Sequence, residues 1–280
     1  MRIDAHVHVW GPRELERYDW MTPEMAAIRR PFGLDDLEPL LDAHRFDSAV
    51  LVQTYSSVEE TESFLELAAQ SPRVAGVVGW VDLTNPDLAE TLGELRARPD
   101  GGYLVGIRHQ VHDEEDPDWL LREDVRRGLR ALQEAGLVYD LLVRTRELPA
   151  GLETARAFPE LRIVVDHIAK PPIAAGELEP WATHMADLTR LEHVSCKLSG
   201  LVTEADWEGW RREDLAPYVD RAVECFGEER LLFGSDWPVC TLAAPYDEVV
   251  AVAEQAVGRS PKVFGENASR IYGLSSGRHG

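Results

Sequence analysis

The chain of 280 residues carries 29 basic and 50 acidic side chains, which gives a formal net charge of −21. So acidic a surface repels nucleic acids and anionic membranes, and we expect neither as a partner. The three cysteines form no close pair, which argues against a disulfide framework and fits a reducing compartment. The sequence shows no signal-peptide pattern and no apolar run long enough to span a bilayer, so we expect a cytoplasmic protein.

Short runs rich in Val, Ile and Leu alternate with longer amphipathic segments along the chain. This composition is typical of strands that are covered on both faces, and segments such as ETESFLELAAQ and DEVVAVAEQAV have helical periodicity. We predict eight strands, near residues 2–9, 48–54, 74–82, 104–110, 138–144, 162–167, 193–198 and 230–235.

Alternation of this kind predicts a single (β/α)8 barrel, or TIM barrel, over residues 1–280, because right-handed crossovers carry each parallel strand onto the next. A doubly wound open sheet is the alternative, but the sequence lacks the glycine-rich phosphate turn of that fold. Residues 10–47 exceed a minimal crossover and predict a loop insertion followed by the first barrel helix. Residues 201–229, with Trp207 and Trp210, are a candidate cover for the barrel mouth, and the tail SSGRHG is expected to be loose.

Two histidines stand one residue apart on the first predicted strand. Because side chains alternate between the faces of a strand, His6 and His8 point to the same side, which is the barrel interior. Two imidazoles buried side by side are costly without partners, and a metal ion or a bound water would satisfy both. We therefore predict a functional pair.

Two further strand ends carry candidates for catalysis. His167 and Lys170 lie where the sixth strand emerges, in IVVDHIAKP, and Asp236 follows the eighth strand, in LLFGSDWPVC. An aspartate in this position often caps a helix or begins a turn. In a closed barrel, however, the eighth strand lies beside the first, so Asp236 is expected near His6 and His8. There a carboxylate can orient a water molecule and take its proton.

The remaining strand ends add polar and aromatic side chains. Arg108 and His109 on the fourth strand could bind an oxygen-rich substrate or a developing oxyanion. The fifth strand carries Asp140, and the seventh carries Lys197 and Ser199. Tryptophans near the strand ends either stack on sugar rings or plug the top of the barrel, and the sequence leaves both open; they are Trp10, Trp80 and Trp237.

These motifs resemble the amidohydrolase superfamily, in its amidohydrolase 2 branch, and within it bacterial sugar-lactone hydrolases. The likeness runs over nearly the whole chain, through IDAHVHVW, VAGVVGWVDL, GIRHQVHDE, YDLLVR, DHIAKPPIAAGELEPW, KLSGLVTEADW, LLFGSDWPVC and NASRIYGL. It implies attack of water on the ester carbonyl of an aldonolactone similar to L-fuconolactone, which opens the ring to the aldonic acid.

The resemblance also implies roles for particular residues. Asp236 would be the general base, and the water or metal site would be lined by His6, His8 and His167. The substrate carbonyl and hydroxyls would be held by Arg108, His109 and Lys170. The candidate wall residues of the pocket are Gln53, Trp80, Asp140 and Lys197.

The chain departs from the two-metal members of the superfamily. It has no bridging Lys or Glu in GIRHQVH and no His in YDLLVRTRE, so a bridged metal pair is not expected. We predict one divalent ion, zinc, bound by His6, His8, His167 and Asp236. Metal-independent hydrolysis is the alternative, with Arg108 or the histidines stabilising the oxyanion.

Two other functions compete with lactone hydrolysis. A metal-dependent non-oxidative decarboxylase occurs in the same branch, and a barrel that only binds a sugar acid is the non-enzymatic possibility. The joint presence of His6, His8 and Asp236 argues against the second. Association into a homo-oligomer through exposed helices is also compatible with the fold.

Overall fold

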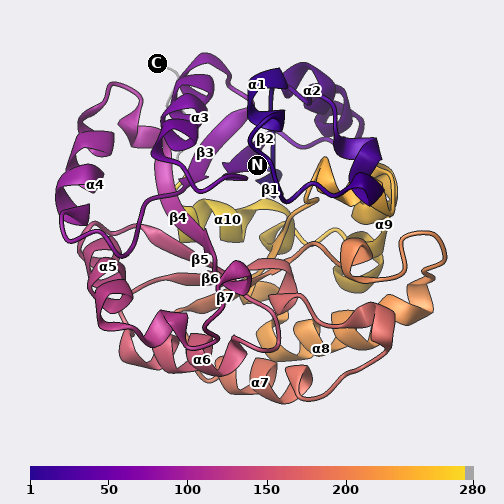
Figure 1. The fold of residues 1–280 in the computed structure, drawn as a ribbon. Helices are drawn as coiled ribbons and strands as arrows, with labels where there is room; N and C mark the ends of the chain where they lie inside the picture. Colours follow the sequence, from indigo (N-terminus) through magenta and orange to yellow (C-terminus); the bar gives the residue numbers. More distant parts are fainter. Residues whose placement is uncertain (275–280) are drawn as a thin grey trace.

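The computed structural model describes residues 1–274, so the predicted loose tail lies outside the described residues. Eight strands form one parallel sheet in the order of the chain, and Figure 1 shows helices surrounding them as a ring. The predicted eight-stranded α/β barrel is therefore confirmed. The strands are β1 Ile3–Val7, β2 Ser48–Val52, β3 Val74–Gly79, β4 Leu104–Gln110, β5 Val138–Leu142, β6 Ile163–Val165, β7 Val194–Leu198 and β8 Leu231–Phe233.

The barrel closes where β8 meets β1. Val7 forms a parallel bridge with Trp237. The backbone N–H of His8 donates to Trp237 O at 2.7 Å, and that of Asp236 donates to His6 O at 2.9 Å. The last strand and the first are therefore joined at their carboxyl ends, where the candidate residues lie.

The helices follow the predicted alternation. Residues 10–47 contain α1 (Pro12–Leu15), a 3-10 helix over Pro23–Ile28 and then α2 (Leu34–Ala43), as expected for an insertion followed by the first barrel helix. Most of the predicted cover at 201–229 is instead the outer helix α8 (Arg212–Arg230), because the chain after β7 returns along the barrel. None of the helices in residues 1–274 is both long and apolar enough to cross a membrane. The α-helices are α1 Pro12–Leu15, α2 Leu34–Ala43, α3 Val58–Gln70, α4 Leu88–Ala97, α5 Glu123–Glu134, α6 Leu148–Ala157, α7 Trp181–Leu188, α8 Arg212–Arg230, α9 Tyr246–Val257 and α10 Asn267–Tyr272.

The last helix, α10, lies across the ring of strands in Figure 1 rather than outside it. Its apolar side chains pack into the interior cluster formed by alternate strand residues such as Ile3, Val50 and Val138. Arg162, which stands just before β6, donates to Ile271 O at 2.5 Å. Helix α10 therefore covers the end of the barrel where the strands begin, opposite the candidate site.

Several strands end earlier than predicted. The sixth strand was predicted to reach residue 167 but ends at Val165, and the eighth was predicted to reach 235 but ends at Phe233. In both cases the chain leaves the sheet to enter a turn with left-handed backbone. Those turns carry His167 and Asp236. Because the strands end early, the turns place both side chains at the carboxyl end of the barrel.

Candidate active site

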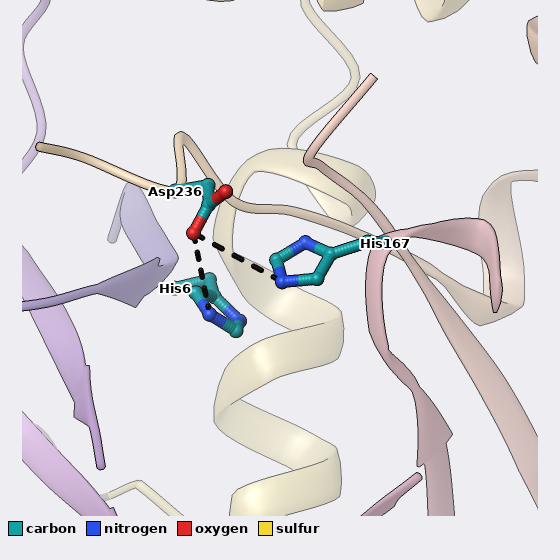
Figure 2. Close-up of side chains that lie close together, drawn as sticks. All are labelled: His6, His167 and Asp236. Carbon is teal, nitrogen blue, oxygen red and sulfur yellow. Dashed lines mark ion pairs between the residues drawn. The ribbon is translucent and has the colours of Figure 1, made fainter. Parts of the chain in front are cut away.

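Three imidazoles surround one carboxylate oxygen at the carboxyl end of the barrel. The Nε2 atoms of His6, His8 and His167 lie 3.7, 3.2 and 3.9 Å from Asp236 Oδ1. Figure 2 shows His6 and His167 pointing toward Asp236 from different elements. All four side chains are buried. The residues that the sequence indicated on three separate strands are thus brought together.

The turns that carry two of these residues have strained backbone. Asp236 has a φ of 60°, and residues 167–170 form a run of four non-glycine residues with φ values of 51°, 46°, 60° and 44°. Each such residue costs on the order of 1–3 kcal/mol, and a β-branched residue such as Ile168 is especially unfavourable there. Strain that the surrounding packing holds in place is concentrated at functional sites, and it supports a functional role for both turns.

A buried carboxylate that our sequence analysis did not single out ties β1 to the loop of Asp236. Asp4 Oδ1 accepts from the backbone N–H of Ser235 at 2.9 Å and of His6 at 3.2 Å, and Oδ2 accepts from the Tyr246 hydroxyl at 2.9 Å. Burial raises the pKa of Asp4 to about 6. Alternation does not point to Asp4, because Ile3 beside it packs in the interior cluster and Asp4 itself contacts Tyr246 of α9.

Burial sets the charge of the site. It lowers the pKa of His6 well below its ordinary value and that of His167 to about 4. Burial alone would raise the pKa of Asp236, but His167 and His8 beside it hold that pKa well below the usual range. Near neutral pH the site therefore contains neutral imidazoles, at His6 and His167, facing an ionised carboxylate.

We expect the protonation of His167 to limit activity on the acid side of the pH profile. Because its pKa is lowered from 6.5 to about 4, the ring stays neutral until the pH falls to that value. A profile of kcat/KM against pH should then decline around pH 4, whereas an ordinary histidine would cause a decline near 6.5. Tryptophan fluorescence recorded across the same range separates loss of activity from unfolding. A decline centred between pH 6 and 7 with the fold intact would contradict this assignment.

The donors present fit a divalent cation. His8 Nδ1 lies 2.8 Å from Val52 O, which only accepts, so the proton is on Nδ1 and Nε2 presents a lone pair. His8 Nε2 lies 3.2 Å from the ionised Asp236 Oδ1. Two acceptor atoms this close need a proton or a cation between them. His6, His167 and Asp236 also offer one ligand atom each within 4.8 Å of one another. Nitrogen and oxygen donors in this number suit zinc.

Arg108 on β4 lies beside the histidines. Its Nη1 donates to Asp166 Oδ2 at 3.2 Å and lies 3.3 Å from His6 Nε2, while Nη2 donates to the backbone and side-chain oxygens of Gln53. Gln53 Nε2 in turn donates to Gln110 Oε1 at 2.8 Å. Within the part of the chain that the structure describes, Arg108 Nε is buried and has no hydrogen-bond partner. Its Nη1 and Nη2 groups therefore link β4 to Asp166 and Gln53 beside His6.

His109 and Trp80 make contacts that differ from the predicted substrate binding. Trp80 Nε1 donates to His109 Nδ1 at 3.0 Å, and His109 Nε2 lies 2.8 Å from Glu114 Oε1. The His109 ring also stacks on Trp119, with centroids 4.3 Å apart. Both ring nitrogens are committed to the protein, so His109 supports the wall of the mouth rather than offering a free nitrogen to a substrate.

The loops after β6 and β7 are joined by an ion pair between Lys170 and Glu204. Another residue of this region, His112, ends the segment GIRHQVH and was not among the predicted site residues. Burial and then the charges of Lys170 and Arg144 lower the pKa of His112 to about 3. Lys170 therefore keeps its predicted place at the mouth, and a neutral histidine lies near it.

Asp140 and Lys197 do not line a wall as predicted. Both are fully buried, and Lys197 Nζ lies 2.5 Å from Asp140 Oδ2, 2.9 Å from Asp166 Oδ1 and 3.1 Å from His6 Nδ1. Two of these contacts are hydrogen bonds, to Asp140 and His6, and the third is an ion pair with Asp166. Burial alone would raise the pKa of Asp166, but Lys197 and His6 hold it well below the usual range. Nothing in the sequence marks Asp166 beyond its place before His167.

Comparison with known proteins identifies the class to which this fold and site belong. The family model described as Amidohydrolase matches residues 3–274, and the chain belongs to this family. It is similar to an L-fucono-1,5-lactonase of Burkholderia multivorans, with 40% identity over 98% of this chain and 96% of that protein. An L-fucono-1,5-lactonase of Burkholderia ambifaria is also 40% identical, over 97% and 95% of the two chains.

A solved structure gives the same likeness in three dimensions. The crystal structure of an amidohydrolase from Burkholderia multivorans with bound zinc superposes with a TM-score of 0.92 at 40% identity, and covers 98% of this chain and 100% of the other. The predicted membership of the amidohydrolase superfamily is confirmed.

Proposed function

We propose that the protein hydrolyses the ring ester of an aldonolactone to the aldonic acid, with L-fucono-1,5-lactone as the first candidate substrate. The observation that carries the proposal is the ionised Asp236 Oδ1 with three imidazole Nε2 atoms within 3.9 Å, at the end of the barrel where substrates bind. The 40% identity to L-fucono-1,5-lactonases over nearly the full chain supports the choice of substrate.

The side chains provide for each proton and charge in this reaction. A water molecule beside Asp236 loses a proton to the carboxylate while its oxygen bonds to the lactone carbonyl carbon. The carbonyl oxygen gains negative charge, which the guanidinium of Arg108, with Nη1 3.3 Å from His6 Nε2, can stabilise. When the tetrahedral intermediate collapses, the bond from the acyl carbon to the ring oxygen breaks. The ring oxygen takes the proton from Asp236 and leaves as the hydroxyl of the aldonic acid.

A divalent ion, with zinc as the first candidate, belongs to this proposal. His6, His167 and Asp236 would hold it, with His8 Nε2 beside the same carboxylate oxygen. An ion bound there would polarise the substrate carbonyl and lower the pKa of water. Support comes from the acceptor atoms that face one another in the site and from the zinc-bound relative.

The test is proton release from a panel of lactones that includes L-fucono-, L-galactono- and D-arabinonolactone, with and without a chelator. We expect rapid hydrolysis, well above the spontaneous rate, of at least the first, and loss of activity after chelation. The same samples are assayed for carbon dioxide release from aromatic acids. Carbon dioxide release without lactone hydrolysis would replace this proposal with the decarboxylase alternative, which has less support because the 40% identical relatives are lactonases.

A cytoplasmic location and assembly into a homo-oligomer remain predictions from the sequence, and a role in sugar-acid breakdown follows from the proposed substrate. Under the proposal, the substrate is a neutral polyhydroxylated ring and the product an anion. Gel filtration with light scattering determines the oligomeric state.

A further inference from the structure

Beneath His6 lies a buried cluster of four charges. Arg108 and Lys197 supply two positive charges, and Asp140 and Asp166 supply two negative ones, with side chains that are at most 5% exposed. Lys197 is one of only three lysines in the chain. Burying a lysine is costly unless it is paired, so its placement requires an explanation.

The cluster is connected to the far end of the barrel through one side chain of α10. The Tyr272 hydroxyl lies 2.8 Å from Asp140 Oδ1 and 2.9 Å from Asp140 Oδ2. It donates to this carboxylate from the end of the barrel that α10 covers. Asp140 Oδ2 accepts from Lys197 at 2.5 Å, and Lys197 Nζ reaches His6 Nδ1 at 3.1 Å. A continuous line of polar contacts therefore runs from the C-terminal helix to a histidine of the candidate site.

Lys197 is held between competing partners. Its ammonium group contacts the carboxylates of Asp140 and Asp166 on two sides and His6 on the third. If the Tyr272 hydroxyl is removed, Asp140 loses its second donor in a site without solvent, and its charge is then balanced by Lys197 alone. Lys197 is drawn toward Asp140, and its contact with His6 weakens.

We propose that Tyr272, acting through Asp140 and Lys197, is a positioning residue that sets the orientation and environment of the His6 ring. The inference rests on the proposed function for its effect on turnover, but the contacts themselves do not depend on it. It gives the helix that covers the opposite end of the barrel a part in the reaction. It also assigns Asp140 and Lys197 to the support of His6, in place of the substrate contact expected from the sequence.

The test compares Tyr272→Phe with Tyr218→Phe in the full-length chain. Tyr218 is a matched control, because its hydroxyl also makes a hydrogen bond, to Glu177 O at 3.1 Å on the outer layer. The protein is labelled with ¹⁵N-histidine and kept in chelator, so that no ion competes for the ring nitrogens. The His6 signals are assigned as those that disappear in His6→Gln. We expect the His6 ring ¹⁵N signals to move in Tyr272→Phe and to stay in place in Tyr218→Phe.

Kinetics supply the second readout. Loss of support around an active-site histidine lowers activity by roughly 10–100-fold, so we expect kcat for the lactone to fall by about tenfold or more in Tyr272→Phe with KM little changed. The double variant Lys197→Met/Asp140→Asn removes one charge of each sign. It keeps the cluster neutral and should give the same pattern, even if Tyr272→Phe folds poorly.

Three results would overturn the inference. The first is that the His6 signals stay in place both in Tyr272→Phe and in the double variant. The second is an unchanged kcat per folded molecule. The third is a rise in KM alone, which would indicate that Lys197 contacts the substrate. If the wild-type protein hydrolyses no lactone, the proposed function fails, but the His6 signals still decide the positioning role.

Discussion

Replacing Asp236 with Asn is expected to lower kcat/KM for the lactone by about 10²–10⁴-fold, the range that a positioned general base contributes. The amide has the shape of the carboxylate but cannot take a proton from water, and it carries no charge to face the three imidazoles within 3.9 Å. Far-UV circular dichroism and a urea titration should show that the fold is retained.

The matched control for this variant is Asp220→Asn. Asp220 is exposed on the outer helix α8, so the same chemical change there should leave kcat/KM at the wild-type value. If Asp236→Asn turns over lactone as fast as Asp220→Asn does, Asp236 is not the base and the proposed mechanism is wrong.

The second large effect is expected from Gly200→Ala. A Cβ atom at Gly200 would lie 2.6 Å from Cγ and Nδ1 of His167, closer than such atoms can approach. The His167 ring must therefore shift, and with it the hydrogen bond between its Nδ1 and Ser199 Oγ, now 2.9 Å long. A displacement of about 1 Å in an active site can cost on the order of 10²-fold, so we expect kcat/KM to fall by about that factor.

Gly136→Ala separates this contact from backbone strain. Gly136 has a φ of 66° and Gly200 a φ of 65°, so alanine is equally unfavourable at both positions. A Cβ at Gly136, however, meets nothing within 4 Å. Both variants should lose stability in urea denaturation, Gly200→Ala more than Gly136→Ala because of the added contact, and only Gly200→Ala should lose activity. Equal activity in the two variants would show that the position of the His167 ring does not matter.

The sequence was sufficient to predict the fold and the main cluster of the site. Strand-like runs separated by helical periodicity predicted a closed barrel, and closure alone placed Asp236 beside β1. Alternation along the first strand then put His6 and His8 on the interior face. Each step depended on regular geometry, and the distances between Asp236 and these histidines agree with it.

The parts that could not be predicted depend on irregular backbone and long-range burial. Residues 167–170 adopt left-handed backbone without a glycine, so no local pattern marks the turn that presents His167. Lys197 has the sequence position of a mouth residue, and only its contacts with Asp140 and Asp166 reveal that it is enclosed. Tyr272 lies on a helix outside the eight repeating units, and nothing near it in the sequence points to Asp140.

The most direct test of the account is a single turnover of L-fucono-1,5-lactone by the purified enzyme in H₂¹⁸O. Mass spectrometry of the aldonic acid and its fragments then locates the label. Attack of water on the acyl carbon near Asp236 predicts one ¹⁸O in the new carboxylate and none in the released hydroxyl, at a rate well above spontaneous hydrolysis. Label in the hydroxyl would contradict attack on the acyl carbon, and a rate no faster than the uncatalysed reaction would contradict the assignment of this site as a lactone hydrolase.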